Sequence, residues 1–233
     1  MAGMKPLRLF PRLCFLSILL LAACAVQAPP PAPAAAPDTS AAWYQQAARS
    51  GKKVYQIDAA QSLITVTVRR GGALARLGHD HVIASRSVAG FVAPDAGRAD
   101  FHFRLDQMTV DEPALRSAAG LDTQPSADAI EGTRANMLGR VLEAARYPVV
   151  TLHAERVRGK DGVLSLTVTL HGVTRTMDVP VTIERTRTSM TASGRLQLLQ
   201  TDFGITPMSV MGGAMVVQDP MELAFNIVAS AGR

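Results

Sequence analysis

The chain has 233 residues, with 24 Lys and Arg against 19 Asp and Glu and a formal charge of +5, and 48% of its residues are hydrophobic. This balance excludes an intrinsically disordered chain, which would combine low hydrophobicity with high net charge. The sequence holds a single long apolar run and two cysteines, which excludes a membrane protein with several spans and a disulfide-stabilised scaffold.

Residues 1–23 have the features of a secretory signal peptide. A basic start is followed by the apolar run Leu13–Val26, which is shorter than the about 20 residues of a membrane-spanning helix. The run ends in Leu21-Ala22-Ala23-Cys24, which resembles the lipobox of bacterial lipoproteins. That resemblance implies cleavage before Cys24 and acylation of this cysteine. The alternatives are an ordinary signal peptide and an uncleaved anchor.

Residues 24–50 are expected to form a tether that ends in a short helix. The segment is rich in proline between residues 29 and 37, and proline-rich chains extend at about 3.1 Å per residue. The Ala-rich stretch Ala41–Arg49 favours one or two helical turns. Loss of the signal peptide removes three basic residues and leaves 21 against 19 acidic ones, so no basic patch for nucleic acid is predicted. It also removes Cys14, so the domain after Cys24 has no thiol for a disulfide, a nucleophile or a metal.

From Lys53 onward the sequence alternates between apolar and polar residues with a period of two. Segments such as Ile64–Val68 and Leu164–Leu170 place apolar side chains on one face, which predicts strands of an antiparallel sheet with one wet face. About eight to ten such strands would expose unpaired edges in a flat sheet, and closure into a barrel removes them. We therefore predict a mainly β domain, an antiparallel barrel, over residues 51–233.

One segment has a helical period instead. Between Ala127 and Arg146 apolar residues recur at spacings of three and four, with Ser126 placed to cap the start and Pro148 placed to stop the end. We predict one amphipathic helix over these residues, preceded by a short turn near Pro113–Ala119.

The apolar faces of the predicted strands would line the barrel interior and form the candidate ligand-binding site. Its residues are Ile64, Val66, Val68, Phe101, Phe103, Leu164, Leu166, Val168, Val181, Ile183, Leu223, Phe225 and Ile227. A barrel of about eight strands is either filled by its side chains or holds one small ligand, and alternation does not separate these two states. A hollow interior of this kind suits an extended hydrocarbon, because each buried CH₂ contributes about 0.8 kcal/mol.

Four segments resemble the YceI-like family and follow its order along the chain. They are Val54–Thr67 (VYQIDAAQSLITVT), Val88–Phe91 (VAGF), Arg146–Leu152 (RYPVVTL) and Leu166–Pro180 (LTVTLHGVTRTMDVP). The resemblance implies an antiparallel, lipocalin-like barrel that binds polyisoprenoid or related long-chain lipids in the periplasm, without a cofactor or a known catalytic apparatus. Where the family commonly has Arg-Asp-x-His-Leu, this chain reads Arg134-Ala135-Asn136-Met137-Leu138. The sequence therefore offers no dedicated partner for a polar head group.

The residue after the lipidation site bears on location. Ala25 stands where an aspartate typically retains lipoproteins in the inner membrane. We therefore expect an outer-membrane lipoprotein on the periplasmic side, held through an N-terminal lipid anchor. Its expected partner is a long-chain isoprenoid or another lipid such as a quinone, and the chain is compatible with a homodimer.

His79-Asp80-His81 is the one cluster with metal-ligand character. Two residues apart on a strand, both imidazoles would face the same side, as a metal site needs, with Asp80 pointing away. The alternative function is thus a periplasmic metal-binding or stress-response protein that uses His79 and His81. The other histidines, at 102, 153 and 171, fall on the polar faces of their strands and are expected to face solvent. A filled barrel that binds a protein partner is a third reading.

Other candidate chemistry is sparse. Met208, Met211 and Met215 suit either Cu(I) binding or flexible packing at an apolar mouth. No motif of a nucleophile elbow, a phosphate-binding loop or a dinucleotide site occurs. The acidic residues Asp95, Asp106, Asp111 and Glu112 are expected to be charges at strand ends or in loops. We expect no enzymatic activity.

Overall fold

The computed structural model describes residues 39–121 and 123–231. The predicted signal peptide, the lipidation site at Cys24 and the proline-rich tether lie outside these residues. Within the described ranges no helix has both the length and the apolar character needed to cross a membrane.

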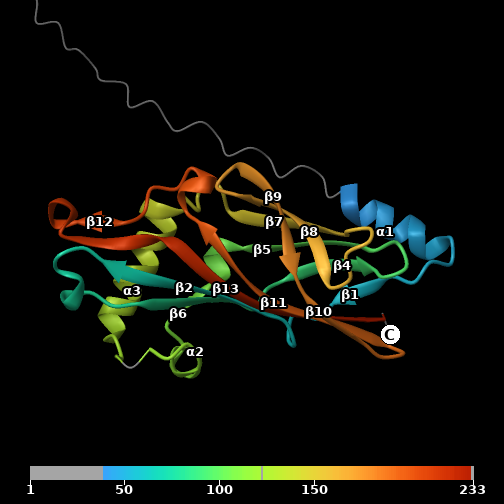
Figure 1. The fold of residues 1–233 in the computed structure, drawn as a ribbon, viewed down its shortest axis with the longest axis horizontal. Coiled ribbons are helices and arrows are strands. Elements are labelled where there is room, and N and C mark those ends of the chain that lie inside the picture. Colours follow the sequence, from blue (N-terminus) through green and yellow to red (C-terminus); the bar gives the residue numbers. More distant parts are fainter. Residues whose placement is uncertain (1–38, 122, 232–233) are drawn as a thin grey trace, which may run out of the picture. The chain divides into compact units, whose positions relative to one another are not determined.

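Thirteen β-strands dominate the secondary structure of the described residues (Figure 1). They are β1 (Tyr55–Ile57), β2 (Leu63–Gly71), β3 (His81–Ser85), β4 (Ala89–Ala93), β5 (Arg98–Arg104), β6 (Thr109–Val110), β7 (Val149–Arg156), β8 (Val163–Leu170), β9 (Val173–Pro180), β10 (Thr182–Arg185), β11 (Ser189–Leu199), β12 (Ser209–Val210) and β13 (Met215–Ala231). The number exceeds the eight to ten predicted, because two-residue pairings such as β6 and β12 are present and because β9 ends at Pro180, which lacks a backbone N–H.

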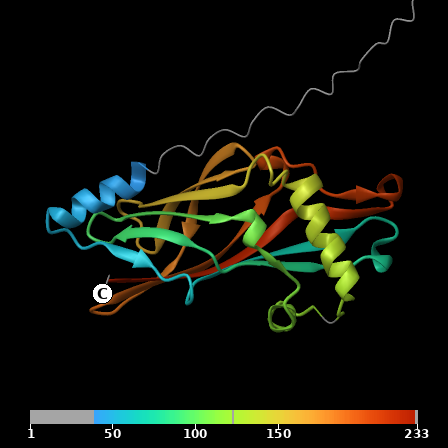
Figure 2. The same ribbon diagram turned by 180° about the vertical axis from the view of Figure 1, so that it is seen from behind.

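The strands form one antiparallel sheet that curls around its apolar face. The ladder runs in the order β6-β3-β2-β13-β1-β4-β5-β7-β8-β9, and β11 and β12 pair with the other edge of β13. The last strand of this path, β9, returns into contact with β11. Figures 1 and 2 show the strands surrounding a common interior. The antiparallel, lipocalin-like architecture predicted from the sequence is confirmed.

The 17-residue strand β13 joins the parts of the sheet. One of its edges pairs first with β2 and then with β1. The register against β2 shifts between Val217 and Met221, which marks a bulge that bends the strand. The side-chain amide of Gln200 donates to the carbonyl oxygens of Gln218 and Asp219, at 2.8 and 3.3 Å, and so holds the bulge in place.

Three α-helices are present in the described residues: α1 (Thr39–Arg49), α2 (Pro113–Ala118) and α3 (Ala127–Asn136). The N-cap prediction for α3 is confirmed, since the Ser126 hydroxyl accepts the Ala129 N–H at 3.2 Å. The predicted end at Arg146 is wrong. A π-helical turn over Met137–Val141 follows α3, and Glu143 then adopts a left-handed conformation with φ 43°, which a continuing helix does not permit.

The helices α3 and α1 lie at opposite ends of the sheet in both views (Figures 1 and 2). The residues of α1 were assigned to the tether, but the helix packs on β4. Tyr44 is buried, stacks on Phe91 with ring centroids 5.4 Å apart, and donates its hydroxyl to Asp100 at 2.8 Å. The last part of the tether is therefore held against the barrel.

The hairpin between β8 and β9 explains part of the family resemblance. His171 and Gly172 form its two-residue turn, both with positive φ (53° and 75°), as a type I′ turn requires. A Cβ on Gly172 would lie 2.7 Å from the Tyr147 ring. Two of the four segments that carry the resemblance therefore meet at this contact.

Candidate ligand-binding cavity

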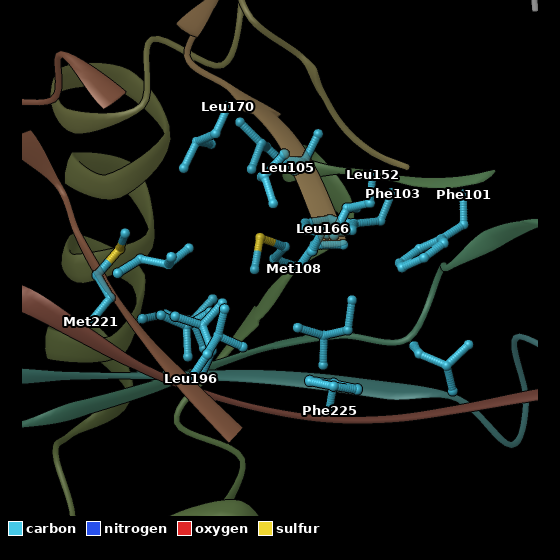
Figure 3. A pocket seen from close by; sticks show the side chains of 18 of the residues that line it. Phe101, Phe103, Leu105, Met108, Leu152, Leu166, Leu170, Leu196, Met221 and Phe225 are labelled. Carbon is cyan, nitrogen blue, oxygen red and sulfur yellow. The ribbon is translucent and has the colours of Figure 1, made fainter. Parts of the chain in front are cut away.

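The curled sheet encloses an apolar cavity of approximately 340 Å³. This volume falls in the range of small-molecule binding sites, which starts at about 300 Å³. Figure 3 shows Phe101 and Leu166 facing Phe225 and Leu196 across the space, so opposite parts of the sheet supply opposite walls. The side chains drawn there are hydrocarbon apart from methionine sulfur atoms.

The structure places twelve of the thirteen predicted wall residues along this cavity. They are Ile64, Val66, Val68, Phe101, Phe103, Leu164, Leu166, Val168, Val181, Leu223, Phe225 and Ile227. Ile183 lies elsewhere: it follows the break at Pro180, belongs to β10 and borders a separate surface pocket beside Arg156 and Lys160. Whether the twelve side chains bind a ligand stays a prediction.

Helix α3 and its π-helical turn close one end of the cavity. Met137, Val141 and Leu142 line the cavity from this element, whereas Ile57 and Met190 line it from the strands. These helix residues are absent from the predicted ligand-binding set, although an amphipathic helix is predicted over this segment. The three- and four-residue spacing of the apolar residues in this segment was the sequence signal that could have identified them as lining residues.

Four of the lining residues are polar, and three of them gather at the α3 end. His81 begins β3, while Thr133 and Asn136 lie three residues apart on α3 and so share a face. The Nε2 atom of His81 lies 3.5 Å from the Thr133 hydroxyl. The fourth, Gln200, uses its amide nitrogen to hold the β13 bulge.

A buried carboxylate orients His81. The Nδ1 atom of His81 lies 2.6 Å from an Asp111 oxygen, and Asp111 also accepts the Val82 N–H at 3.0 Å and an Arg116 N–H at 2.6 Å. Burial alone would raise the pKa of Asp111. The hydrogen bonds from His81, Val82 and Arg116 outweigh that effect, so the pKa lies below its ordinary value and the carboxylate is ionised at neutral pH.

Asp111 and Arg116 form a buried pair that the sequence did not predict. Asp111 directly follows β6, at a strand end as predicted, but its side chain is fully buried, which the sequence did not indicate. Arg116 is 1% exposed and was not singled out, because one arginine on a six-residue helix gives no sequence signal. Its remaining N–H groups donate to the carbonyl oxygens of Asp80, at 2.8 Å, and Thr123.

The histidine pair does not have the expected strand geometry. His79 precedes β3 and only His81 belongs to it, and the two rings lie 6.2 Å apart with planes at 71°. Asp80 accepts the Arg70 N–H at 2.9 Å. In the ranges 39–121 and 123–231 no group of three or more His, Cys, Asp or Glu side chains is placed to hold a metal ion. His79 and His81 therefore gain no third ligand from these residues.

The remaining candidates are dispersed. His153 lies on the outer face, 2.7 Å from Asp100. The expectation that His171 faces solvent is wrong, because its side chain is only 12% exposed and packs on the Tyr147 ring at 4.6 Å. Met208 lines the cavity, whereas Met211 is 66% exposed.

Comparison with known proteins settles the family. A family model described as the YceI-like domain matches residues 55–229. This chain belongs to the YceI-like family. The match spans β1 to β13 and leaves α1 outside it.

Two solved structures share this YceI-like fold. A domain from Saccharophagus degradans, described as a polyisoprenoid binding domain implicated in plant cell wall breakdown, is 15% identical with a TM-score of 0.54, and the match covers 76% of this chain and 98% of that one. The BcnA protein of Burkholderia cenocepacia is 16% identical with a TM-score of 0.52, with 75% and 99% covered. A search of curated proteins finds no match.

Proposed function

We propose that this YceI-like protein binds an extended hydrocarbon lipid, an isoprenoid or a related long-chain molecule, inside the barrel and acts as a carrier or store for it. The apolar cavity carries the proposal, because its strand-built walls offer hydrocarbon contact along its length. Every CH₂ buried there contributes about 0.8 kcal/mol, so affinity rises with chain length. The Saccharophagus domain of the same fold, described as polyisoprenoid binding, supports this choice of ligand.

The proposal extends to location. Cys24 would carry the lipid anchor, Ala25 favours the outer membrane, and the protein would face the periplasm. Binding without catalysis is proposed, in keeping with a wall that is almost entirely hydrocarbon. A protein in this place would hold a lipid while it is away from either membrane.

A charge placed in the wall tests the binding site. We expect Leu166→Arg to lower lipid retention by at least tenfold, because the ligand would have to desolvate a cation along the cavity. Retention is measured by native mass spectrometry and organic extraction of the full-length protein purified from its own envelope. Thr167→Arg is the matched control, since Thr167 is the next residue on β8 and bonds Thr176 on the outer face.

The control should retain lipid at the wild-type level. A second variant, Leu166→Trp, fills the cavity without adding charge and should also displace ligand. A folded Leu166→Arg or Leu166→Trp protein that retains lipid like the wild type would refute the assignment of this cavity.

A further inference from the structure

The cavity is chemically asymmetric. Its strand-built walls are hydrocarbon, whereas His81, Thr133 and Asn136 place hydrogen-bonding atoms together beneath α3. Polar side chains at the end of an apolar cavity fix the orientation of a ligand. An extended lipid with one polar end would therefore lie with that end under α3 and its chain along the strands.

The bonds around His81 define what it presents to the cavity. Asp111 is a carboxylate and only accepts hydrogen bonds, so the Nδ1 atom of His81, 2.6 Å away, must carry the proton. In the neutral imidazole Nε2 is then an acceptor. The Thr133 hydroxyl lies 3.5 Å from Nε2, which is longer than a strong O–H···N bond, so Nε2 keeps capacity for a ligand.

The buried charges beside His81 are already paired. Asp111 and Arg116 form a buried ion pair at 2.6 Å, and the other Arg116 bonds go to backbone and Thr123 oxygens. Among the described cavity-lining residues His81 is the only ionisable one. An anionic head group would lose its hydration here without meeting an unpaired cation, which is unfavourable.

We propose that His81 is the head-group binding residue of the cavity and selects an uncharged long-chain alcohol, whose hydroxyl donates to Nε2. Thr133 and Asn136 flank this position, and their side chains can donate hydrogen bonds to the oxygen atom of the ligand's hydroxyl group. Asp111 and Arg116 are positioning residues, because they hold the ring and do not reach the ligand. The inference rests on the proposed lipid-binding function and adds the chemistry of the polar end.

Three ligands with one chain test the inference. They are geranylgeraniol, the hydrocarbon with hydrogen in place of the hydroxyl, and geranylgeranyl monophosphate, each radiolabelled and partitioned between detergent micelles and the delipidated full-length protein. We expect the wild type to bind the alcohol about tenfold more tightly than the hydrocarbon, the value of one buried hydrogen bond. The monophosphate should bind more weakly than the alcohol.

Variants then assign the preference to His81. His81→Leu should bring the alcohol-to-hydrocarbon ratio close to one by weakening the alcohol alone. Thr176→Val, a change of similar size on the outer face of β9, should leave the ratio unchanged. In wild-type protein labelled with ¹⁵N-histidine, the alcohol but not the hydrocarbon should shift the Nε2 resonance of His81, and this measurement holds even if His81→Leu does not fold.

The failures are distinguishable. Binding of the hydrocarbon with no preference for the alcohol, or a preference that survives His81→Leu, would overturn the inference and leave the lipid-binding function standing. Tighter binding of the monophosphate would overturn the choice of an uncharged head group. If none of the three ligands binds the wild type, the proposed function fails and the inference fails with it.

Discussion

Asp111 shows how one buried side chain organises a site. Its carboxylate accepts hydrogen bonds from His81, Val82 and Arg116, which come from β3 and α2. Asp111 itself has positive φ (57°), a conformation that aspartate tolerates better than most residues. A buried charge of this kind is retained only while its partners are in place, since an unpaired ion in the interior is strongly destabilising.

This environment predicts a specific pH dependence. The pKa of Asp111 is lower in the folded protein than its ordinary value of 3.8, so its stabilising effect is complete above about pH 4 and is lost as pH falls further. We expect Asp111→Asn to lower the free energy of unfolding by about 3 kcal/mol at pH 7, because Arg116 is left without a counter-ion. The difference from the wild type should shrink at pH 3.

Urea unfolding at both pH values measures this effect. Asp106→Asn is the control, since the Asp106 side chain is half exposed and bonds Arg104 at the surface. An Asp111→Asn deficit that is the same at pH 3 and pH 7 would show that ionisation of this carboxyl does not stabilise the fold.

At the scale of elements, the close approach of β4 and β5 depends on Gly90. This residue has φ 154°, and a Cβ at its position would lie 2.2 Å from the carbonyl oxygen of Asp100. The neighbouring backbone cannot move away, because Ala89 and Phe91 pair with His102 and Asp100 in the same ladder. Backbone contact thus explains the glycine in the segment Val88–Phe91.

A pair of glycine variants tests this reading. Gly90→Ala should lower the free energy of unfolding by at least about 2 kcal/mol, through steric conflict and an unfavourable φ. Gly132→Ala should raise it by about 0.5–1 kcal/mol, because Gly132 is exposed within α3 with nothing within 4 Å of a Cβ. Thermal or urea unfolding measures both changes in stability. A Gly90→Ala protein as stable as the wild type would contradict the requirement for glycine at this position.

In the whole molecule, α3 and α1 lie at opposite ends of the barrel (Figure 1). The polar lining residues of the cavity gather at the α3 end. Tyr44 fixes α1 to β4 and β5 through Phe91 and Asp100. A chain that leads from Cys24 would therefore meet the barrel at the α1 end.

The proposed acylation of Cys24 can be measured directly. We expect radiolabelled palmitate to enter the wild type and Cys14→Ser but not Cys24→Ser, because the acylated residue would be Cys24 and Cys14 leaves with the signal peptide. The mass of the purified wild type should correspond to a chain that begins at an acylated Cys24. Label in Cys24→Ser, or a mass that includes residues 1–23, would refute lipidation at this site.

Local patterns in the sequence are enough to predict the antiparallel sheet, the start of α3 and twelve of the cavity residues, because period-two alternation and capping are local properties of the chain. These patterns misplaced Ile183 and the end of α3, where Pro180 and the left-handed Glu143 interrupt a regular period. The hollow of the barrel and the meeting of His81, Asp111, Arg116 and Thr133 at one end follow from the folded structure alone. His81, Arg116 and Thr133 lie on three separate elements and Asp111 lies between β6 and α2, and contacts between such segments depend on how the sheet curls and where the helices pack.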